Sequence, residues 1–174
     1  MEKDWTRQIH TYFISFLDRD IWPLVFAPEI GQMLCHYFRR PPYYRNQPLV
    51  QQVDSSENET EATKGQFHVD NLHQVSLMLL VNDLGEGDTH MQYAIGSHLR
   101  DLRRGVMMSF EDYAAQVQDN SNVLQCIGAK GTLYIFSATG IPRANCRPRS
   151  TRKVLYLNVT TGHNTKELTD DLSI

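Results

Sequence analysis

The stretch GQFHVD at residues 65–70, with the apolar run from Val75 to Val81 that follows it, decides how this chain is interpreted. Successive side chains of a β-strand point to opposite faces of the sheet. In an extended segment His68 and Asp70 therefore point to the same face, while the residues that alternate with them point away. The sequence thus predicts an imidazole and a carboxylate side by side on one strand.

This pair has a recognised chemistry. A His and an Asp on one face can supply two of the three protein ligands in a 2-His-1-carboxylate site for Fe(II). Short His-x-Asp sequences also occur as hydrogen-bonded pairs on protein surfaces, so the interpretation depends on the rest of the chain. We treat His68 and Asp70 as candidate metal ligands on this basis.

Length and composition indicate a globular protein. The chain has 174 residues, of which 41% are hydrophobic and 21% charged. These values favour a single domain over residues 1–174 with a sizeable core. Within it we expect residues 1–40 to form a helical N-terminal support and residues 48–162 to form the core.

Charge and cysteine content exclude several partners. The net charge is −3 without a basic tract, so we expect no nucleic-acid binding. No apolar run reaches the ~20 residues that cross a bilayer, so we expect no membrane association and a cytoplasmic location. The three cysteines lack Cys-x-x-Cys spacing, which argues against disulfides and zinc. The chain is expected to bind a small-molecule substrate, as a monomer or a small homo-oligomer.

Two helices are predicted near the N-terminus. Apolar residues recur at three- and four-residue intervals from Trp5 to Leu17, which predicts a helix. A second helix begins at Pro28, where proline is tolerated, and continues to Phe38 before the prolines at 41–42. His36 lies off the apolar stripe and is expected at the surface.

Short strands separated by turns make up the rest. Their predicted ranges are 48–54, 65–70, 74–84, 91–95, 123–127, 132–137 and 151–161, with a short helix at 109–118 and loops at 55–64 and 139–150. The strands follow one another without alternating helices, which indicates antiparallel sheets. The expected fold is mainly β, a two-sheet sandwich or jelly roll with the two helices on its outside.

The order of motifs resembles the Fe(II)/2-oxoglutarate oxygenase superfamily, and within it the phytanoyl-CoA dioxygenase-like branch. The matching segments are Phe67–Asp70, Val81–Leu84 with its following turn, Tyr93–His98, Gly131–Phe136 and Arg152–Asn158. The resemblance implies a double-stranded β-helix, the cupin-like form of the jelly roll. It also implies Fe(II) and 2-oxoglutarate as cofactors.

The resemblance assigns a role to each candidate. His68 and Asp70 would hold iron, and Arg152 would bind the far carboxylate of 2-oxoglutarate, because a planar guanidinium matches two carboxylate oxygens. The alternative for Arg152 is a strand-edge arginine in solvent, and Arg143, Arg147 and Arg149 compete for the role. The pocket is expected to be lined by strands and by loops at 43–44 and 55–64.

One position departs from the family pattern. The second histidine ligand is expected about ten residues before Arg152, where this sequence has Pro142. Proline offers no donor atom to a metal. The alternative donors considered are His73, His90, His98, His163 and Cys146, with His90 expected at a surface turn.

Two functions therefore remain open. The first is an Fe(II)/2-oxoglutarate-dependent hydroxylase of a small organic substrate with an incomplete or rearranged ligand set. The second is a catalytically silent β-helix domain that binds a small molecule or a partner protein without iron turnover. Loss of the distal histidine argues for reduced or lost activity in the first case.

Overall fold

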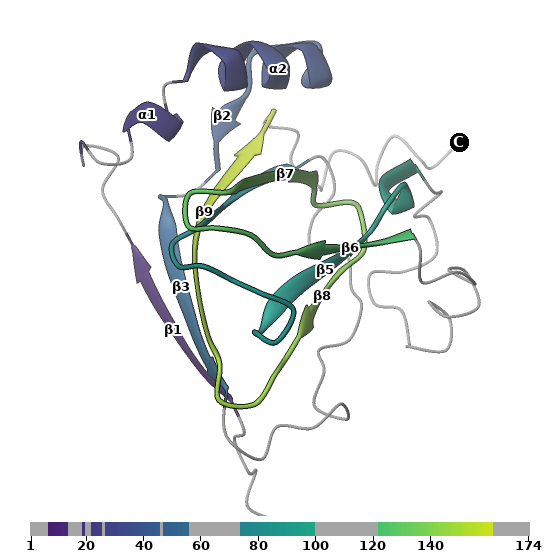
Figure 1. The fold of residues 1–174 in the computed structure, drawn as a ribbon. Coiled ribbons are helices and arrows are strands. Elements are labelled where there is room, and N and C mark those ends of the chain that lie inside the picture. Colours follow the sequence, from purple (N-terminus) through teal and green to yellow (C-terminus); the bar gives the residue numbers. More distant parts are fainter. Residues whose placement is uncertain are drawn as a thin grey trace, which may run out of the picture.

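The computed structural model in Figure 1 describes residues 7–13, 19, 22–25, 27–45, 47–55, 74–99 and 122–161. Its elements are β1 (Arg7–Phe13), α1 (Trp22–Val25), α2 (Pro28–Phe38), β2 (Tyr43–Tyr44), β3 (Leu49–Ser55), β4 (Gln74–Leu80), β5 (His90–Ala94), the 3₁₀ turn η3 (Ser97–Leu99), β6 (Val123–Cys126), β7 (Leu133–Ser137), β8 (Pro142–Asn145) and β9 (Thr151–Thr160). Strands dominate, which confirms the mainly β prediction. No helix in these segments is long and apolar enough to cross a membrane.

The strands form two antiparallel sheets. The larger has the order β1-β3-β9-β4-β7, with β2 pairing onto β9, and the smaller has the order β6-β5-β8. Figure 1 shows the small sheet facing the large one, with β9 at the centre of the latter. The chain passes repeatedly from one sheet to the other, so strands distant in sequence become neighbours across a shared interior.

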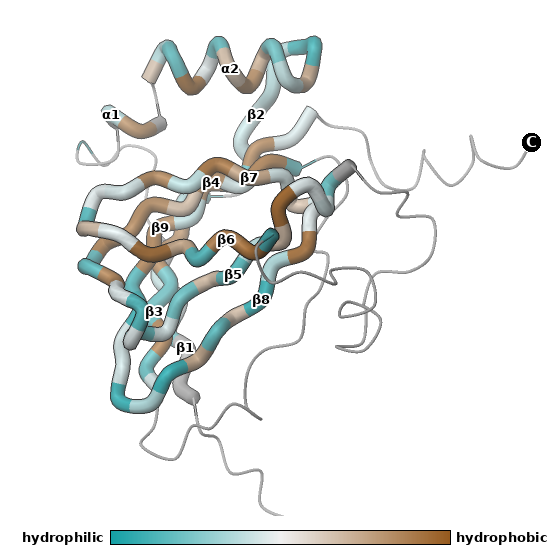
Figure 2. The backbone as a smooth tube through the Cα atoms, turned by 45° about the vertical axis from the view of Figure 1, so that its right-hand side comes forward, coloured by the Kyte–Doolittle hydropathy of each residue, from teal (hydrophilic) through white to brown (hydrophobic). Residues whose placement is uncertain are grey.

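The outer face of the large sheet packs against the helices. Residues of β4 and β9 that alternate along the strands contact the apolar stripe of α2, whose Leu34 is buried. The cluster consists of Leu34, Val75, Leu77, Leu155, Leu157 and Val159. Pro28 occupies the first turn, as the sequence predicts, and Arg39 ends the helix in a left-handed conformation. Figure 2 shows hydrophobic segments of β6 and β7 beneath α2.

The residues between the two sheets form a second core. They are Met78, Leu80, Leu84, Met91, Tyr93, Cys126 and Val154, with Tyr134, Phe136 and Tyr156 partly buried beside them. In β4, residues 75, 77 and 79 face the helices, while residues 78 and 80 face inward. This two-sided burial confirms the predicted assignment of the Val75–Val81 run, because a strand covered on both faces reads as continuously apolar.

The first predicted helix is wrong. Residues 7–13 form β1, which pairs with β3 along its full length, from Arg7 opposite Ser55 to Phe13 opposite Leu49. The segment QIHTYF is rich in β-branched and aromatic residues, which favour a strand. Tyr12, one of the apolar residues whose spacing suggested a helix, is 56% exposed. Of the two predicted helices, only the second, α2, is present in the described segments. The single helical turn α1 precedes it.

Further differences lie in the loops. The predicted loop at 139–150 contains β8, and the loop at 43–44 forms β2. His90, expected at a surface turn, is a β5 residue with 2% exposure. Cys126 and Cys146 are buried and Cys35 is exposed, all as free thiols. Residues 65–70, the predicted helix at 109–118 and most of the loop at 55–64 fall outside the described residues.

Candidate functional site

Arg152 lies at the start of β9 and faces the interior between the sheets. It alternates with Val154 and Tyr156, which belong to the inner core. The side chain is buried, and its Nη2 donates a 2.7 Å hydrogen bond to Gln51 Oε1 on neighbouring β3. The buried Nε has no hydrogen-bond partner within the described structure. An unpaired donor on a buried cation is costly, and such a group is well suited to bind an anion.

The thiol of Cys126 faces Arg152 from the opposite sheet. Burial raises the pKa of Cys126 to about 12, and the nearby Arg152 charge opposes this shift only in part. The thiol is therefore neutral at physiological pH and cannot serve as the counter-charge of the guanidinium. Arg152 is thus an inward-facing cation that is hydrogen-bonded to the Gln51 amide and lies near the neutral thiol of Cys126.

Pro142 begins β8 and pairs with Tyr93 of β5. Paired residues of antiparallel strands share a face of the sheet. Since Tyr93 belongs to the inner core, buried Pro142 also faces the interior. The position that aligns with the expected second histidine therefore points inward and presents only ring carbons and a carbonyl.

A serine hydroxyl holds the segment before Pro142 against β5. Ala94 donates its N–H to the Ile141 carbonyl at 3.1 Å, but the reverse bond is not direct. Instead Ile141 donates its N–H to Ser97 Oγ at 2.8 Å, and this hydroxyl donates to the Ala94 carbonyl at 2.7 Å. The buried hydroxyl of Ser97 thus bridges the Ile141 amide and the Ala94 carbonyl.

Polar side chains line the inner face of the large sheet near the end of the interior at which Ser97 lies. Arg45 Nη1 donates to Gln74 Oε1 at 2.9 Å, and Gln74 Nε2 donates to Ser76 Oγ at 3.2 Å. Ser76 Oγ in turn donates to Asn158 Oδ1 at 2.9 Å. Gln74 and Ser76 are buried and share the inward face of β4 with Met78. One end of the interior is therefore polar, whereas its middle is apolar.

The structure describes some of the candidate metal ligands and not others. His68 and Asp70 lie outside the described residues, as do His73 and His163. Among the residues that are described, no group of three or more His, Cys, Asp or Glu side chains is positioned to hold a metal ion. The geometry that would join Arg152 to the His-x-Asp pair therefore stays a prediction.

His90 is buried but is poorly suited to bind a metal. It alternates with inward-facing Met91 and so lies on the outer face of the small sheet. Its Nδ1 is 2.7 Å from the Asp88 carbonyl oxygen, and its Nε2 is 2.7 Å from Gln125 Oε1. Both ring nitrogens are engaged in hydrogen bonds, which indicates a structural role.

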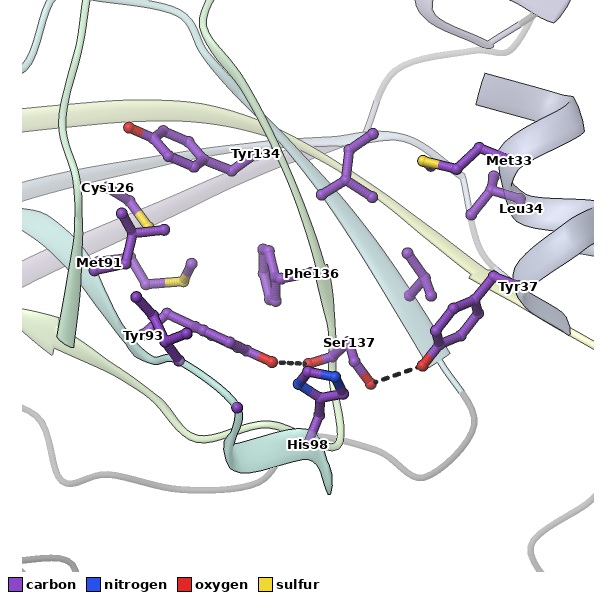
Figure 3. A pocket seen from close by; sticks show the side chains of 15 residues that line it. Met33, Leu34, Tyr37, Met91, Tyr93, His98, Cys126, Tyr134, Phe136 and Ser137 are labelled. Carbon is purple, nitrogen blue, oxygen red and sulfur yellow. Dashed lines mark hydrogen bonds between the residues drawn. The ribbon is translucent and has the colours of Figure 1, made fainter. Parts of the chain in front are cut away.

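A pocket of about 420 Å³ opens between α2 and the edge strands of the two sheets, and includes the inward-facing Tyr93 and Cys126 (Figure 3). His98 lies at its edge. Strand residues line it, and Tyr43 and Tyr44 do not. Tyr37 of α2, which the sequence did not single out, is 54% exposed and lines this pocket.

The chain matches no protein-family model and no curated protein sequence. Solved structures do resemble it. The epimerase SnoN, in complex with Fe³⁺, alpha ketoglutarate and nogalamycin RO, matches with a TM-score of 0.61 and 13% identity, over 87% of this chain and 63% of SnoN. EctD from S. alaskensis, with 2-oxoglutarate and 5-hydroxyectoine, matches with a TM-score of 0.60 and 13% identity, over 87% of this chain and 56% of EctD.

A third structure, AviO1 from Streptomyces viridochromogenes Tue57, matches with a TM-score of 0.57 and 14% identity, over 80% of this chain and 60% of AviO1. The chain thus spans about three-fifths of the length of these proteins. At such identities the similarity concerns the fold. The chain has the double-stranded β-helix fold shared with Fe/2-oxoglutarate oxygenases.

The described residues fit a carboxylate better than they fit a metal. Arg152 offers a buried Nε–H that has no partner among the described residues, on the inner face between the two sheets. Pro142, where the sequence interpretation expects the second histidine, offers no donor atom to iron. A metal here would depend on His68 and Asp70, whose positions the structure does not describe.

Proposed function

We propose that this chain is an Fe(II)/2-oxoglutarate-dependent oxygenase of a small organic substrate, of the phytanoyl-CoA dioxygenase-like type, lacking the distal histidine ligand. In this proposal His68 and Asp70 hold iron, and Arg152 binds the far carboxylate of 2-oxoglutarate. The shared fold supports the class. The motif order of the sequence supports the branch.

The main support for the proposal is the burial and hydrogen bonding of the Arg152 guanidinium. A buried guanidinium costs several kcal/mol of desolvation unless a partner compensates for it. Its Nη2 has an amide partner, whereas Nε is unpaired among the described residues. A carboxylate of a bound 2-oxo acid would supply the missing acceptor and the opposite charge together.

The chain's other residues would shape the site around this anchor. Bound iron with 2-oxoglutarate would supply the oxidising chemistry. The apolar inner core would exclude water around Arg152, which strengthens its attraction for a carboxylate. The Gln74–Ser76–Asn158 chain would offer hydrogen bonds at the polar end of the interior.

A second function is favoured by Pro142. Because this residue is buried, faces inward and has no donor atom, the chain would hold iron with two protein ligands. Loss of a ligand should weaken metal binding at least as much as loss of a partner that orients one, roughly 10–100-fold. The alternative is therefore a silent domain that binds a 2-oxo acid or another small molecule without turnover.

Binding of 2-oxoglutarate to metal-free protein tests the role of Arg152 directly. Isothermal titration calorimetry should show affinity falling roughly 10–100-fold in Arg152→Met, because a charge-assisted hydrogen bond to a carboxylate is lost. The matched control is Arg149→Met, which changes an exposed arginine three residues away and should leave affinity unchanged. Equal affinity in wild type and Arg152→Met would refute the cosubstrate assignment.

Anaerobic titration with Fe(II) then separates the two functions. The enzyme proposal expects one iron per chain in the presence of 2-oxoglutarate, loss of that iron in His68→Ala, and succinate on exposure to air. The silent domain expects 2-oxoglutarate binding with neither iron uptake nor succinate. In that case Pro142→His, checked for an unchanged melting temperature, should restore iron binding.

A further inference from the structure

The pocket in Figure 3 has walls from both sheets and from α2. Its volume of about 420 Å³ lies in the range of small-molecule sites. The side chains of Tyr93, Cys126 and Phe136 form its inner part, and Leu34 of α2 forms part of its outer wall. The pocket is thus a recess between the edges of the two sheets, capped by a helix.

Exposed apolar side chains collect at its rim. Seven large hydrophobic residues in the described part of the chain are exposed, and five of them line this one pocket. The five are Met33, Tyr37, Ile95, Leu124 and Ile135. Single exposed hydrophobic residues need no explanation, but a contiguous group at the mouth of a recess is typical of a binding site.

Among the residues that the structure describes, the pocket lining includes no side chain with a fixed charge. None of the 15 side chains that line the pocket is Asp, Glu, Lys or Arg. Burial raises the pKa values of both Cys126 and Tyr93 to about 12, so these groups are also neutral. A charged ligand would lose its hydration without gaining a counter-charge from the inner walls.

Polar groups converge at one end of the pocket. Tyr93 Oη is committed to the Ser137 carbonyl through a 2.9 Å hydrogen bond, whereas Tyr37 Oη reaches Ser137 Oγ at a long 3.4 Å. Because a hydroxyl at 3.4 Å is only weakly bonded, Tyr37 can exchange this contact for a ligand. The exposed His98 lines the same pocket and projects over Ser137 in the view of Figure 3.

We propose that this pocket binds an uncharged, largely apolar small molecule whose single polar group, a hydroxyl or carbonyl, contacts Tyr37 and His98. A second protein chain would need about 800 Å² of complementary surface on each partner. The concave shape, the neutral lining and the localised polar end match a small molecule. The inference concerns the metal-free pocket and stands apart from the proposed oxygenase activity.

If the oxygenase proposal also holds, the occupant is the primary substrate. Tyr93 forms part of the pocket and pairs with Pro142 in the neighbouring strand. Cys126 forms another part and faces Arg152. The pocket therefore adjoins both positions that the proposed site uses, which extends the prediction of a small organic substrate to one without charge.

Two fluorescent probes that differ in one charged group test the proposal. N-phenyl-1-naphthylamine is neutral, and 1-anilinonaphthalene-8-sulfonate carries the same rings with a sulfonate. We expect the neutral probe to bind metal-free protein at least about tenfold more tightly, because burying the sulfonate is uncompensated. Equal or tighter binding of the sulfonate would overturn the assignment of an uncharged ligand.

A matched pair of variants locates the binding. Tyr37 and Tyr43 are exposed to 54% and 51%, and only Tyr37 lines the pocket. Tyr37→Glu should weaken the neutral probe at least about tenfold, since it introduces a charge at the polar end, and Tyr43→Glu should not. Leu124→Glu, on the edge strand β6, should weaken binding of the neutral probe in the same way, because Leu124 lines the pocket on the wall opposite Tyr37.

Unfolding midpoints and sedimentation complete the test. Circular dichroism should show similar melting temperatures for the three variants, because all three positions are largely exposed. Equal probe binding by all variants would place the probe elsewhere and refute the site. A wild-type dimer that Tyr37→Glu converts to a monomer, without any change in probe affinity, would assign the surface to a second copy of the chain instead.

Discussion

The phenol of Tyr93 lies where a side chain on Gly140 would begin. A Cβ atom at residue 140 would overlap Tyr93 Oη and the adjacent ring carbon. The tyrosine is held there by its 2.9 Å hydrogen bond to the Ser137 carbonyl, and its ring packs against Phe136 at a centroid distance of 5.4 Å. Glycine at 140 therefore allows the β7–β8 connection to close over the inner core.

Gly140→Ala is expected to destabilise the protein. Neither the buried phenol nor the backbone of residue 140 can move freely, so overpacking should cost about 1–3 kcal/mol of unfolding free energy. Urea unfolding of both proteins measures the change. An unchanged urea midpoint would show that the β7–β8 connection can move away from Tyr93 without a loss of stability.

A double-mutant cycle isolates the contact. Tyr93→Phe removes the hydroxyl but leaves the ring carbons that also clash, so it should rescue Gly140→Ala only in part. Tyr93→Leu should rescue it further, although it costs stability by itself through lost burial. Strictly additive changes in unfolding free energy would exclude the proposed overlap.

Ser97→Ala should loosen the segment before Pro142. Removing the bridging hydroxyl leaves the Ile141 N–H and the Ala94 carbonyl buried without their partner, which costs about 1–3 kcal/mol. The Ile141 amide should also exchange with deuterium faster. Ser137→Ala is the control, because that residue is half-buried and water can replace its hydroxyl.

Stability should fall as pH rises from about 9 to 12. Burial raises the pKa of Cys126 from 9.0 to about 12 and that of Tyr93 from 10.0 to about 12. Over this interval the unfolded chain releases protons that the folded chain retains, so the unfolding free energy decreases. For one such group the slope approaches about 1.4 kcal/mol per pH unit.

Urea titrations under reducing conditions at several alkaline pH values would measure this slope. Cys126→Ala should make it shallower, since one of the two groups no longer titrates. Cys35→Ala is the matched control, because that thiol is exposed. A slope that is identical in wild type and Cys126→Ala would contradict the assignment.

Arg152→Met should affect stability and ligand binding in opposite directions. The guanidinium is buried and its Nε has no partner among the described residues, so replacing it with an apolar side chain of similar length removes a desolvation cost. The ligand-free variant should be as stable as wild type or up to about 2 kcal/mol more stable. Thermal and urea unfolding check this, and marked destabilisation would indicate that Arg152 serves the fold itself.

The sequence predicted the parts of the fold in which burial follows a simple period. The apolar run of β4, which is covered on both faces, and the stripe of α2, which is covered on one face, are examples. β1 was mistaken for a helix because its partner is the non-local β3, which local spacing does not reveal. β8 was missed because proline and arginine resemble a loop.

The candidate site was predictable only in part. Arg152 was selected from motif order, and its inward direction follows from the alternation of β9. The position of this pocket was not predicted, because its lining comes from five segments that meet only in the folded chain. His90 was misplaced since its burial depends on partners such as Gln125, which lie on a different strand.

Pro142 also affects the edge of β8 that has no partner among the described strands. In β8 the N–H groups of Arg143 and Asn145 point toward β5, whereas positions 142 and 144 point to the opposite edge. Proline has no N–H, so among the four residues of β8 only Ala144 offers a donor there. A strand that pairs with this edge can therefore accept only one main-chain hydrogen bond from an amide of β8. Pro142 therefore weakens the pairing that a further strand could form with this edge of β8.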